Sequence, residues 1–304
     1  MNRKPHIWKL KNRHLLLGER TFIMGILNVT PDSFSDGGKY LDPDRAFVRA
    51  IELEEQGADM IDIGAESTKP GSARVSEAEE LRRLVPVLKR LRDKLTIPIS
   101  VDTYKSAVAE KALEHGAEII NDPSGLTFDP QLARIAANFD AGLILNHMRG
   151  TPETWAKLPP LKDVLGAIQH DLEATIHRAV RSAVDRTRIV IDPGLGFGKR
   201  KEQNSEILAR LGELNRFELP ILVAPSRKGF LEQTEGPALL AASAAAVTAA
   251  ILSGAYIIRV HDVAEMKAAA QIADQVLSLS LSGTLDNSAS RVGPPRSGGS
   301  ALRK

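Results

Sequence analysis

Eight short apolar runs, each followed by a segment with helical spacing, constrain the fold of this 304-residue chain more than any other feature. The runs are rich in β-branched residues and span 22–29, 60–65, 97–103, 118–122, 142–148, 188–194, 220–226 and 256–262. Strands that are apolar along most of their length are typical of parallel sheets covered by helices. Eight strand–helix repeats predict an α/β fold, a (β/α)₈ TIM barrel, with an open doubly wound sheet as the alternative.

The segments between these runs carry the helical pattern. In segment 76–94 the apolar residues recur at helical spacing, with arginine and lysine on the other face: Leu81, Leu84, Val85, Leu88 and Leu91. We expect a helix whose apolar face covers the sheet. Segment 236–258 has no charged residue and is long enough to span a membrane. Because it is mostly small residues and the charged Arg259 follows it, we predict a buried helix and then a strand.

The two ends of the chain differ in composition from the barrel, which we place at residues 21–281. Residues 1–20 precede the first barrel strand, and we expect a strand or hairpin there, with Gly18 and Glu19 at the turn, that closes the bottom of the barrel. Residues 282–304 are rich in glycine, serine and proline. This composition predicts a disordered, flexible tail without a role in chemistry.

The overall composition argues against several classes of protein. The absence of cysteine excludes disulfides, thiolate catalysis and cysteine-ligated metals, and it fits a reducing compartment. The excess of 40 basic over 38 acidic residues is too small to indicate nucleic-acid binding. Basic residues scattered through the N-terminus argue against a signal peptide. We therefore expect a cytoplasmic protein that binds neither nucleic acid nor membranes.

Polar residues gather where the predicted strands end. The eight strands are followed or ended by Asn28, Glu66, Asp102, Asn121, His147, Asp192, Ser226 and Arg259. The C-terminal rim of a barrel collects the ends of all its strands, whereas an open sheet concentrates its site where the strand order reverses. The distribution over eight strands favours the barrel and predicts a site at its C-terminal rim.

One part of this rim carries groups suited to a phosphate or diphosphate. Thr68 and Lys69 lie in a turn after the second strand, and residues 226–228, Ser-Arg-Lys, follow the seventh. Arg259 and His261 are two residues apart at the eighth strand, so they are expected to share a face and bind one anion together. Barrels often bind phosphate at their last two strands. Ordinary surface turns are the alternative for the first two groups.

Another part of the rim is suited to a polar heterocycle. Asp102 and Asn121 directly follow apolar strands and offer hydrogen-bonding groups to a ring with alternating donors and acceptors. Capping of a helix is the alternative for Asp102. Segment 191–199 contains Asp192 and then three glycines spaced by two, with Phe197 among them. This segment is not a dinucleotide-binding fingerprint, and it predicts close approach of the backbone to a ligand or a structural glycine turn.

The sequence contains no histidine motif with metal-ligand spacing. A metal at the rim is therefore expected to be Mg²⁺, held mainly by substrate phosphates, with the side-chain oxygen of Asn28 as a ligand. His147 and Met148 are further candidates for the site, although a single histidine at a strand end is more often structural. No serine-hydrolase arrangement occurs.

Eight motifs resemble, in order, those of the dihydropteroate synthase family: NVTPDSFSDGG (28–38), GAESTKPG (64–71), VDTYK (101–105), IINDPSG (119–125), HMRGTP (147–152), DPGLGFGK (192–199), SRKGFL (226–231) and RVHDV (259–263). The resemblance spans roughly residues 7–280. It implies a barrel that condenses 6-hydroxymethyl-7,8-dihydropterin diphosphate with p-aminobenzoate, giving 7,8-dihydropteroate and pyrophosphate in folate biosynthesis. It also implies an SN1-like reaction assisted by Mg²⁺, a homodimer, and a target of sulfonamides.

The resemblance implies a role for each matching residue. The pterin is expected to bind to Asp102, Asn121, Met148, Asp192, Gly196, Phe197 and Lys228. The p-aminobenzoate and loop side is expected to comprise Thr68, Lys69, Pro70, Phe197, Ser226 and Arg227. The diphosphate is expected to bind to Asn28, Thr68, Lys69, Arg259 and His261, with Asn28 as the Mg²⁺ ligand. The residues expected to take part in catalysis are Asn28, Asp102, Asp192, Lys228, Arg259 and His261.

Two positions depart from the family pattern. Lys69 stands where an arginine is usual, and Pro123 stands where an apolar β-branched residue is usual. Lysine keeps the charge but loses bidentate geometry, so we expect anion binding by the second loop to be weakened or altered. Two alternatives for function are a related pterin-binding barrel that transfers methyl groups, which has little use for the late cationic motifs, and a non-catalytic pterin-binding paralogue.

Overall fold

The computed structural model describes residues 3–30, 42–67, 72, 74–233 and 235–289. Its main sheet has eight parallel strands: β3 (Phe22–Asn28), β4 (Met60–Gly64), β5 (Ile99–Asp102), β6 (Ile119–Asp122), β7 (Gly142–Asn146), β8 (Ile189–Asp192), β9 (Leu222–Val223) and β10 (Ile257–Val260). Every strand falls within one of the eight apolar runs, which confirms the predicted strands and their order.

The sheet closes on itself. The last strand, β10, pairs in parallel with the first, β3, and also with β9. Between β8 and β9 a single parallel bridge joins Ile191 to Ile221, and the Ile191 amide donates to the Pro220 carbonyl oxygen at 3.0 Å. An open doubly wound sheet would leave two edge strands unpaired. The closure therefore excludes that alternative and confirms the (β/α)₈ barrel.

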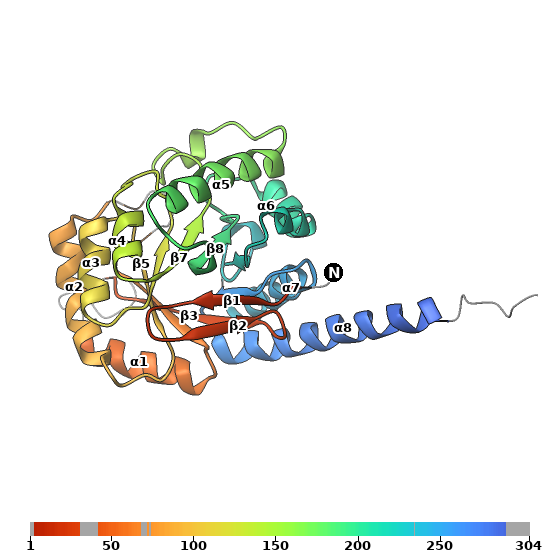
Figure 1. Ribbon diagram of the computed structural model, residues 1–304, viewed down its shortest axis with the longest axis horizontal. Coiled ribbons are helices and arrows are strands. Elements are labelled where there is room, and N and C mark those ends of the chain that lie inside the picture. Colours follow the sequence, from red (N-terminus) through yellow and green to blue (C-terminus); the bar gives the residue numbers. More distant parts are fainter. Residues whose placement is uncertain (1–2, 31–41, 68–71, 73, 234, 290–304) are drawn as a thin grey trace, which may run out of the picture.

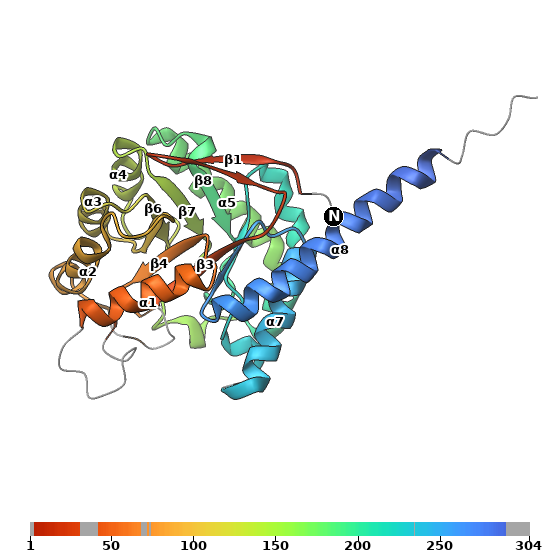
Figure 2. The ribbon, with the colours of Figure 1, turned by 90° about the horizontal axis from the view of Figure 1, so that it is seen from below.

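Helices follow the strands and surround the barrel (Figure 1, Figure 2). The α-helices are α1 (Pro43–Glu55), α2 (Glu77–Leu91), α3 (Ser106–Glu114), α4 (Leu132–Asn138), α5 (Val164–Arg181), α6 (Lys201–Ala209), α7 (Gly236–Leu252) and α8 (Val263–Ala289). Short 3₁₀ helices lie in the connections: η2 (Trp155–Lys157), η3 (Arg186–Arg188), η4 (Leu211–Phe217) and η5 (Gly229–Leu231). The inner faces of the helices and the strands share one buried apolar cluster, which holds the strand ends in fixed positions.

The predicted inward face of α2 is wrong in part. Leu84, Leu88 and Leu91 are buried as expected, and the half-buried Leu81 packs against the core. Val85 is only half-buried, whereas Glu80 and Val87 are buried. The Glu80 carboxylate is buried together with a partner, because it forms an ion pair with Lys105, which follows the neighbouring strand β5. A pattern of apolar residues alone does not reveal such a pairing.

Helix α7 is buried on one face only, which corrects the expectation of a buried helix. Its inner face comprises Ser243, Ala246, Val247, Ala250 and Ile251. The outer face consists largely of exposed alanines and ends at Leu252, whose exposed fraction is 37%. Among the residues that the structure describes, no helix is long and apolar enough to cross a membrane.

The N-terminal extension forms an antiparallel hairpin of two strands, β1 (His6–Lys9) and β2 (His14–Leu17). Its turn lies at residues 10–13, where the Leu10 amide donates to the Arg13 carbonyl oxygen at 2.9 Å, and not at Gly18 and Glu19 as expected. Trp8 is fully buried, and its Nε1 donates at 2.8 Å to the carbonyl oxygen of Arg188, the residue before β8. The hairpin thus covers the N-terminal end of the barrel, opposite the predicted site.

Helix α8 projects beyond the barrel in both views (Figure 1, Figure 2). It continues to Ala289, beyond residue 282, where we expected the flexible tail to begin. The glycine and serine residues in segment 282–289 therefore do not end the helix. The rest of the expected tail, residues 290–304, lies outside the described residues.

Candidate active site

Predicted site residues come together at the C-terminal ends of the barrel strands. Asp102 ends β5, Asp192 ends β8, and Asn121 lies opposite Asp102 in the register of β5 and β6. Arg259, from β10, reaches across the barrel, where its Nη2 donates to Asp102 Oδ2 at 2.8 Å. Strands that are distant in the sequence thus direct polar side chains to one rim.

Asp102 is a largely buried carboxylate, with an exposed side-chain fraction of 13%. Burial raises its pKa to about 7; the Arg259 guanidinium opposes this shift, and the Asp62 carboxylate adds to it. The alternative of a helix cap does not hold, because α3 begins after Lys105, whose amide donates to Thr103 Oγ1 at 3.3 Å. Asp102 faces the other charged groups of the rim instead.

A residue that the sequence motifs do not single out, Asp62 on β4, lies at the centre of these contacts. It is fully buried. Its carboxylate accepts hydrogen bonds from Ser100 Oγ at 2.6 Å, Asn121 Nδ2 at 2.9 Å and Arg259 Nε at 2.6 Å. The signal that could have found it is a single aspartate inside an otherwise apolar strand, because a buried charge needs partners.

Asp192 is held by the glycine-rich loop that follows β8. It is 5% exposed, its Oδ1 accepts from the Gly194 amide at 2.7 Å, and burial raises its pKa. Gly194 has a φ of +70°, and a Cβ there would lie 2.0 Å from the His147 carbonyl oxygen. Only glycine fits such a position. Gly194 therefore serves the close packing of two rim loops.

Lys199 fastens this loop to the one after β7. Its Nζ donates to the carbonyl oxygens of His147 at 2.7 Å, Pro193 at 2.8 Å and Gly194 at 2.6 Å. Burial lowers the pKa of Lys199 well below its ordinary value. An ammonium group has three hydrogens, and all three are used within the protein. Lys199 is therefore a structural residue and has no donor left for a ligand.

Lys228 and Phe197 form a neighbouring part of the rim. Lys228 Nζ lies 4.6 Å from the centre of the Phe197 ring, and a Cβ on Gly196 would lie 3.4 Å from Lys228 Cδ. Phe197 meets Trp155 edge to face, with ring centres 5.4 Å apart. Burial, together with Arg259, lowers the pKa of Lys228 to about 8, against the opposing effect of nearby carboxylates. These residues combine an aromatic face with a cation whose charge is sensitive to pH.

His261 differs from the expectation that it acts as a second cation beside Arg259. Its Nδ1 and Ser226 Oγ are 3.1 Å apart. Burial, with Arg259 and Arg227 adding to it, lowers the pKa of His261 to about 3. The imidazole is therefore neutral near pH 7 and offers hydrogen bonding rather than charge. Arg227, placed by sequence on the amine-substrate side, is exposed and donates from Nε to Asp262 Oδ2 at 3.0 Å.

The other predicted residues are only partly described. Asn28 ends β3 with an exposed side chain, and Met148 is half-buried after β7. A Cβ on Gly64 would lie 3.7 Å from both Asn28 Oδ1 and Asp102 Cβ, so these two side chains flank one glycine. Thr68, Lys69 and Pro70 lie outside the described residues. Within the described ranges no group of three or more histidine, cysteine, aspartate or glutamate residues could hold a metal ion.

The base of the second rim loop, residues 65–76, contains a second cluster that the sequence motifs do not reveal. Lys105 Nζ forms ion pairs with both Glu66 and Glu80. Glu66 Oε2 also accepts from the Val75 amide at 3.3 Å. These contacts join Glu66 and the Val75 amide to α2 and to the segment that follows β5.

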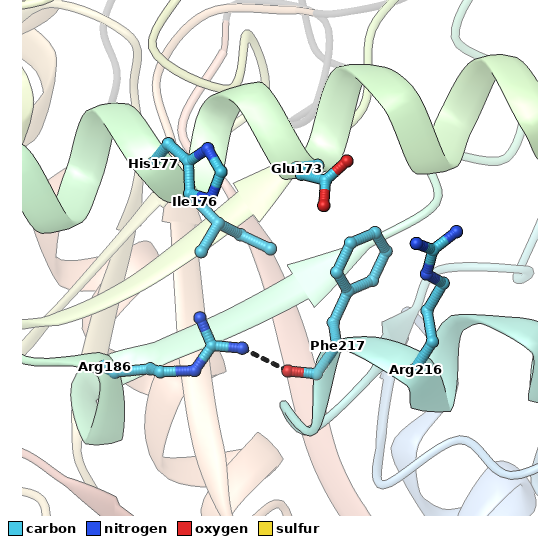
Figure 3. Close-up of a pocket in the computed structure, with 6 residues that line it drawn as sticks. All are labelled: Glu173, Ile176, His177, Arg186, Arg216 and Phe217. Carbon is cyan, nitrogen blue, oxygen red and sulfur yellow. Dashed lines mark hydrogen bonds between the residues drawn. The ribbon is translucent and has the colours of Figure 1, made fainter.

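A separate cavity of about 160 Å³ lies on the outside of the barrel, between α5 and η4 (Figure 3). It is lined by Glu173, Ile176, His177, Arg186, Arg216 and Phe217. Arg186 donates to the Phe217 carbonyl oxygen across it. None of the predicted site residues lines this cavity, and its charged side chains are all exposed. It is distinct from the rim site.

Comparisons with known proteins identify the family of this chain. The model of a family described as "Pterin binding enzyme" matches residues 24–261. The dihydropteroate synthase of Synechocystis sp. is 43% identical over 261 residues, which cover 84% of this chain and 90% of that protein. A Yersinia pestis dihydropteroate synthase structure with a sulfonamide drug complex matches with a TM-score of 0.83 and 40% identity, covering 90% of this chain and 99% of that one. A Xanthomonas albilineans dihydropteroate synthase structure with 4-aminobenzoic acid matches with a TM-score of 0.82 and 38% identity, with the same coverage of 90% and 99%.

The barrel, its rim and these likenesses define a pterin-binding enzyme. Within that class, the chain belongs to the dihydropteroate synthase family. The resemblance carried by the eight motifs is thereby confirmed.

Proposed function

We propose that this protein is a dihydropteroate synthase, which condenses 6-hydroxymethyl-7,8-dihydropterin diphosphate with p-aminobenzoate in folate biosynthesis. The observation that carries the proposal is the convergence of buried polar residues on one rim in a chain of this family: Asp102, Asn121, Asp192, Lys228 and Arg259. The two solved relatives, one with a sulfonamide drug complex and one with 4-aminobenzoic acid, support a site for an aromatic amine.

The carboxylates would recognise the pterin. Asp102 and Asp192 are acceptors for ring N–H groups, and Asn121 adds an amide that both donates and accepts. All three side chains are largely withdrawn from water. Hydrogen bonds in such surroundings meet little competition from solvent and therefore fix the orientation of the ring. Phe197 and the stem of Lys228 would cover its apolar surface.

Bond breaking precedes bond making in the SN1-like reaction. The C–O bond to the diphosphate breaks, its electron pair leaves on the diphosphate oxygen, and the pterin ring stabilises the cation. The amine nitrogen of p-aminobenzoate then forms the C–N bond and loses a proton. The protein needs no covalent nucleophile, which agrees with a chain without cysteine. Arg259 and Lys228 would stabilise the leaving charge, and His261 would donate a hydrogen bond to it.

The residues at the rim fit a Mg²⁺ ion that arrives with the diphosphate. Mg²⁺ prefers oxygen ligands and keeps several waters or phosphate oxygens, so one exposed side-chain oxygen, that of Asn28, is a sufficient protein contribution. Bound Mg²⁺ would neutralise charge on the leaving diphosphate.

The deciding experiment measures pyrophosphate release from the dihydropterin diphosphate in the presence of Mg²⁺, with and without p-aminobenzoate, together with formation of dihydropteroate. Release coupled to product establishes the synthase. Folded protein that binds the pterin but forms no product contradicts it, and the binding paralogue or the methyl-transfer barrel becomes the better account.

The pKa shifts predict a bell-shaped dependence of kcat/KM on pH. Asp102 accepts ring N–H groups only when ionised, and its pKa of about 7 makes kcat/KM rise with pH through that value. Lys228 acts as a cation only when protonated, and its pKa of about 8 makes kcat/KM fall above that value. We therefore expect a narrow maximum between about 7 and 8 in pH-rate profiles of the free enzyme.

Two variants assign the limbs of this profile. Lys228→Arg replaces the amine with a group that stays protonated, so the alkaline limb should disappear while the acid limb remains. Asp102→Asn should remove the acid limb from the residual activity. Limbs that stay in place in both variants would show that other groups, on the enzyme or the substrate, control the profile.

Asn28→Ala is expected to raise the Mg²⁺ concentration required for half-maximal activity by roughly tenfold, because one oxygen ligand is lost. Asn28→Asp keeps an oxygen and adds charge, so its Mg²⁺ requirement should match or fall below that of the wild type. Activity titrated with Mg²⁺ at saturating substrates measures both. An unchanged requirement in Asn28→Ala would remove this residue from the metal site.

We also propose a cytoplasmic homodimer. The cysteine-free sequence supports a reducing compartment. The outer alanine face of α7 allows close helix packing, and the adjacent α8 exposes Ile272, Val276 and Leu279 at 60%, 48% and 72%. Exposed apolar residues at helical spacing favour burial against another copy of the chain. Analytical ultracentrifugation of the full chain tests this, and a monomer at micromolar concentration contradicts it.

A further inference from the structure

Asp62 lies beneath the rim site and connects three barrel strands to β4. It occupies the middle of β4, with Ser100 opposite it on β5 in the parallel register. Its Oδ1 accepts from Ser100 Oγ, and its Oδ2 accepts from both Asn121 Nδ2 and Arg259 Nε. Two of its three partners are therefore residues that we assign to the substrates.

The carboxylate determines which way the Asn121 amide points. An ionised carboxylate only accepts hydrogen bonds, so the atom of Asn121 that faces it must be the NH₂ group. The amide oxygen of Asn121 is then directed away from Asp62. With a neutral or donating group at residue 62, the amide would have no reason to prefer this orientation. Asp62 thereby fixes the pattern of donor and acceptor that Asn121 offers to a ring.

The same carboxylate fixes Arg259. The guanidinium is held at two points, from Nε to Asp62 at 2.6 Å and from Nη2 to Asp102 at 2.8 Å. Two contacts to the planar guanidinium group fix its plane as well as its position. In the described part of the chain Nη1 makes no hydrogen bond. The arginine therefore keeps a donor group in a defined direction.

We propose that Asp62 is a positioning residue for pterin recognition: it orients Asn121 and Arg259 for the dihydropterin diphosphate without touching the substrate itself. This inference rests on the proposed function, in which both partners bind that substrate. A residue that only stabilises the barrel would affect both substrates alike. Loss of Asp62 should instead weaken binding of the dihydropterin diphosphate and not of p-aminobenzoate.

The test compares three variants by calorimetric binding of the dihydropterin diphosphate and by steady-state kinetics. Asp62→Ser removes both site contacts and should raise the Kd and KM of the pterin substrate roughly 10- to 100-fold, as expected when a group that orients a binding residue is lost. Asp62→Asn keeps an acceptor oxygen and should restore part of this loss. Ser100→Ala removes only the third contact of Asp62 and should bind the pterin like the wild type.

The KM for p-aminobenzoate should stay within about twofold of the wild type in all three variants, since Asp62 contacts no residue assigned to that substrate. An equal rise in both KM values, or an unchanged pterin Kd in Asp62→Asn, overturns the inference. The Asp62→Asn arm suffices if Asp62→Ser does not fold. Binding is measured without turnover, so a wild type that binds the pterin but makes no product refutes the synthase and still allows the role of Asp62 to be judged.

A double-mutant cycle separates positioning from general stability. Asn121→Ala should cost much less pterin affinity in the Asp62→Asn background than in the wild type, because the amide is already poorly oriented there. Fully additive losses would show that Asp62 does not act through Asn121, and would contradict that part of the proposal.

Discussion

Asp192→Asn is expected to lower kcat/KM for the dihydropterin diphosphate by roughly 10- to 200-fold while the protein stays folded. A hydrogen bond to a charged acceptor contributes about 1.5–3 kcal/mol, and the change of one carboxylate oxygen to an NH₂ group removes both the charge and one acceptor. Asparagine keeps the shape of the side chain and an oxygen for the Gly194 amide. The loop geometry should therefore persist. Steady-state kinetics with varied pterin substrate measure the effect.

A matched control lies at the other end of the same strand. Asp185 accepts from the Thr187 amide at 2.9 Å just before β8, far from the C-terminal rim. Asp185→Asn is the same chemical change and should leave kcat/KM within about twofold of the wild type. If Asp192→Asn behaved like this control, Asp192 would not bind the substrate.

Lys199→Met is expected to lower the free energy of unfolding by about 3 kcal/mol, and the melting temperature by roughly 6–12 °C. The methionine fills a similar volume but leaves the carbonyl oxygens of His147 and Pro193 without donors, whereas that of Gly194 still accepts from the Phe197 amide at 3.2 Å. Each such loss costs about 1–3 kcal/mol, offset in part because the charge of Lys199 is itself unfavourable when buried. Thermal and denaturant unfolding, followed by circular dichroism, measure the change.

Lys228→Met provides the contrast, because Lys228 is also a lysine whose pKa is lowered by burial. Its removal should change the free energy of unfolding by no more than about 1 kcal/mol and should lower kcat/KM strongly. Two lysines separated in this way, one needed for stability and one for activity, would support the division of roles. A Lys199→Met protein as stable as the wild type would show that the carbonyl oxygens of His147 and Pro193 find other donors.

Local patterns in the sequence were sufficient to predict the barrel and the strand ends. The strands lie within apolar β-branched runs, and Asp102, Asn121 and Asp192 were found because a polar residue at the end of such a run is conspicuous. Closure was predicted from the number of repeats and the polar residues at their ends. The structure adds that β8 and β9 are joined by a single bridge, and that β9 is only two residues long.

Features that depend on contacts between distant segments were missed. Asp62 lies inside a run that predicts a strand, and its partner Arg259 is on the last strand of the barrel. Glu80 was not among the residues expected to face the barrel, because a charged residue usually faces water, and its partner Lys105 lies on another element. The neutral state of His261 likewise results from burial and from cations brought close by the fold.

The pairing of β3 with β10 joins residues 22–25 to residues 257–260. During synthesis the first barrel strand therefore has a bare backbone edge on one side until nearly the whole barrel has left the ribosome. Such an edge, apolar on both faces, is a template for pairing with other chains, and its long-range partner makes closure slow. We therefore expect early parts of the chain to be prone to aggregation, and truncation before β10 leaves a chain that cannot complete its sheet.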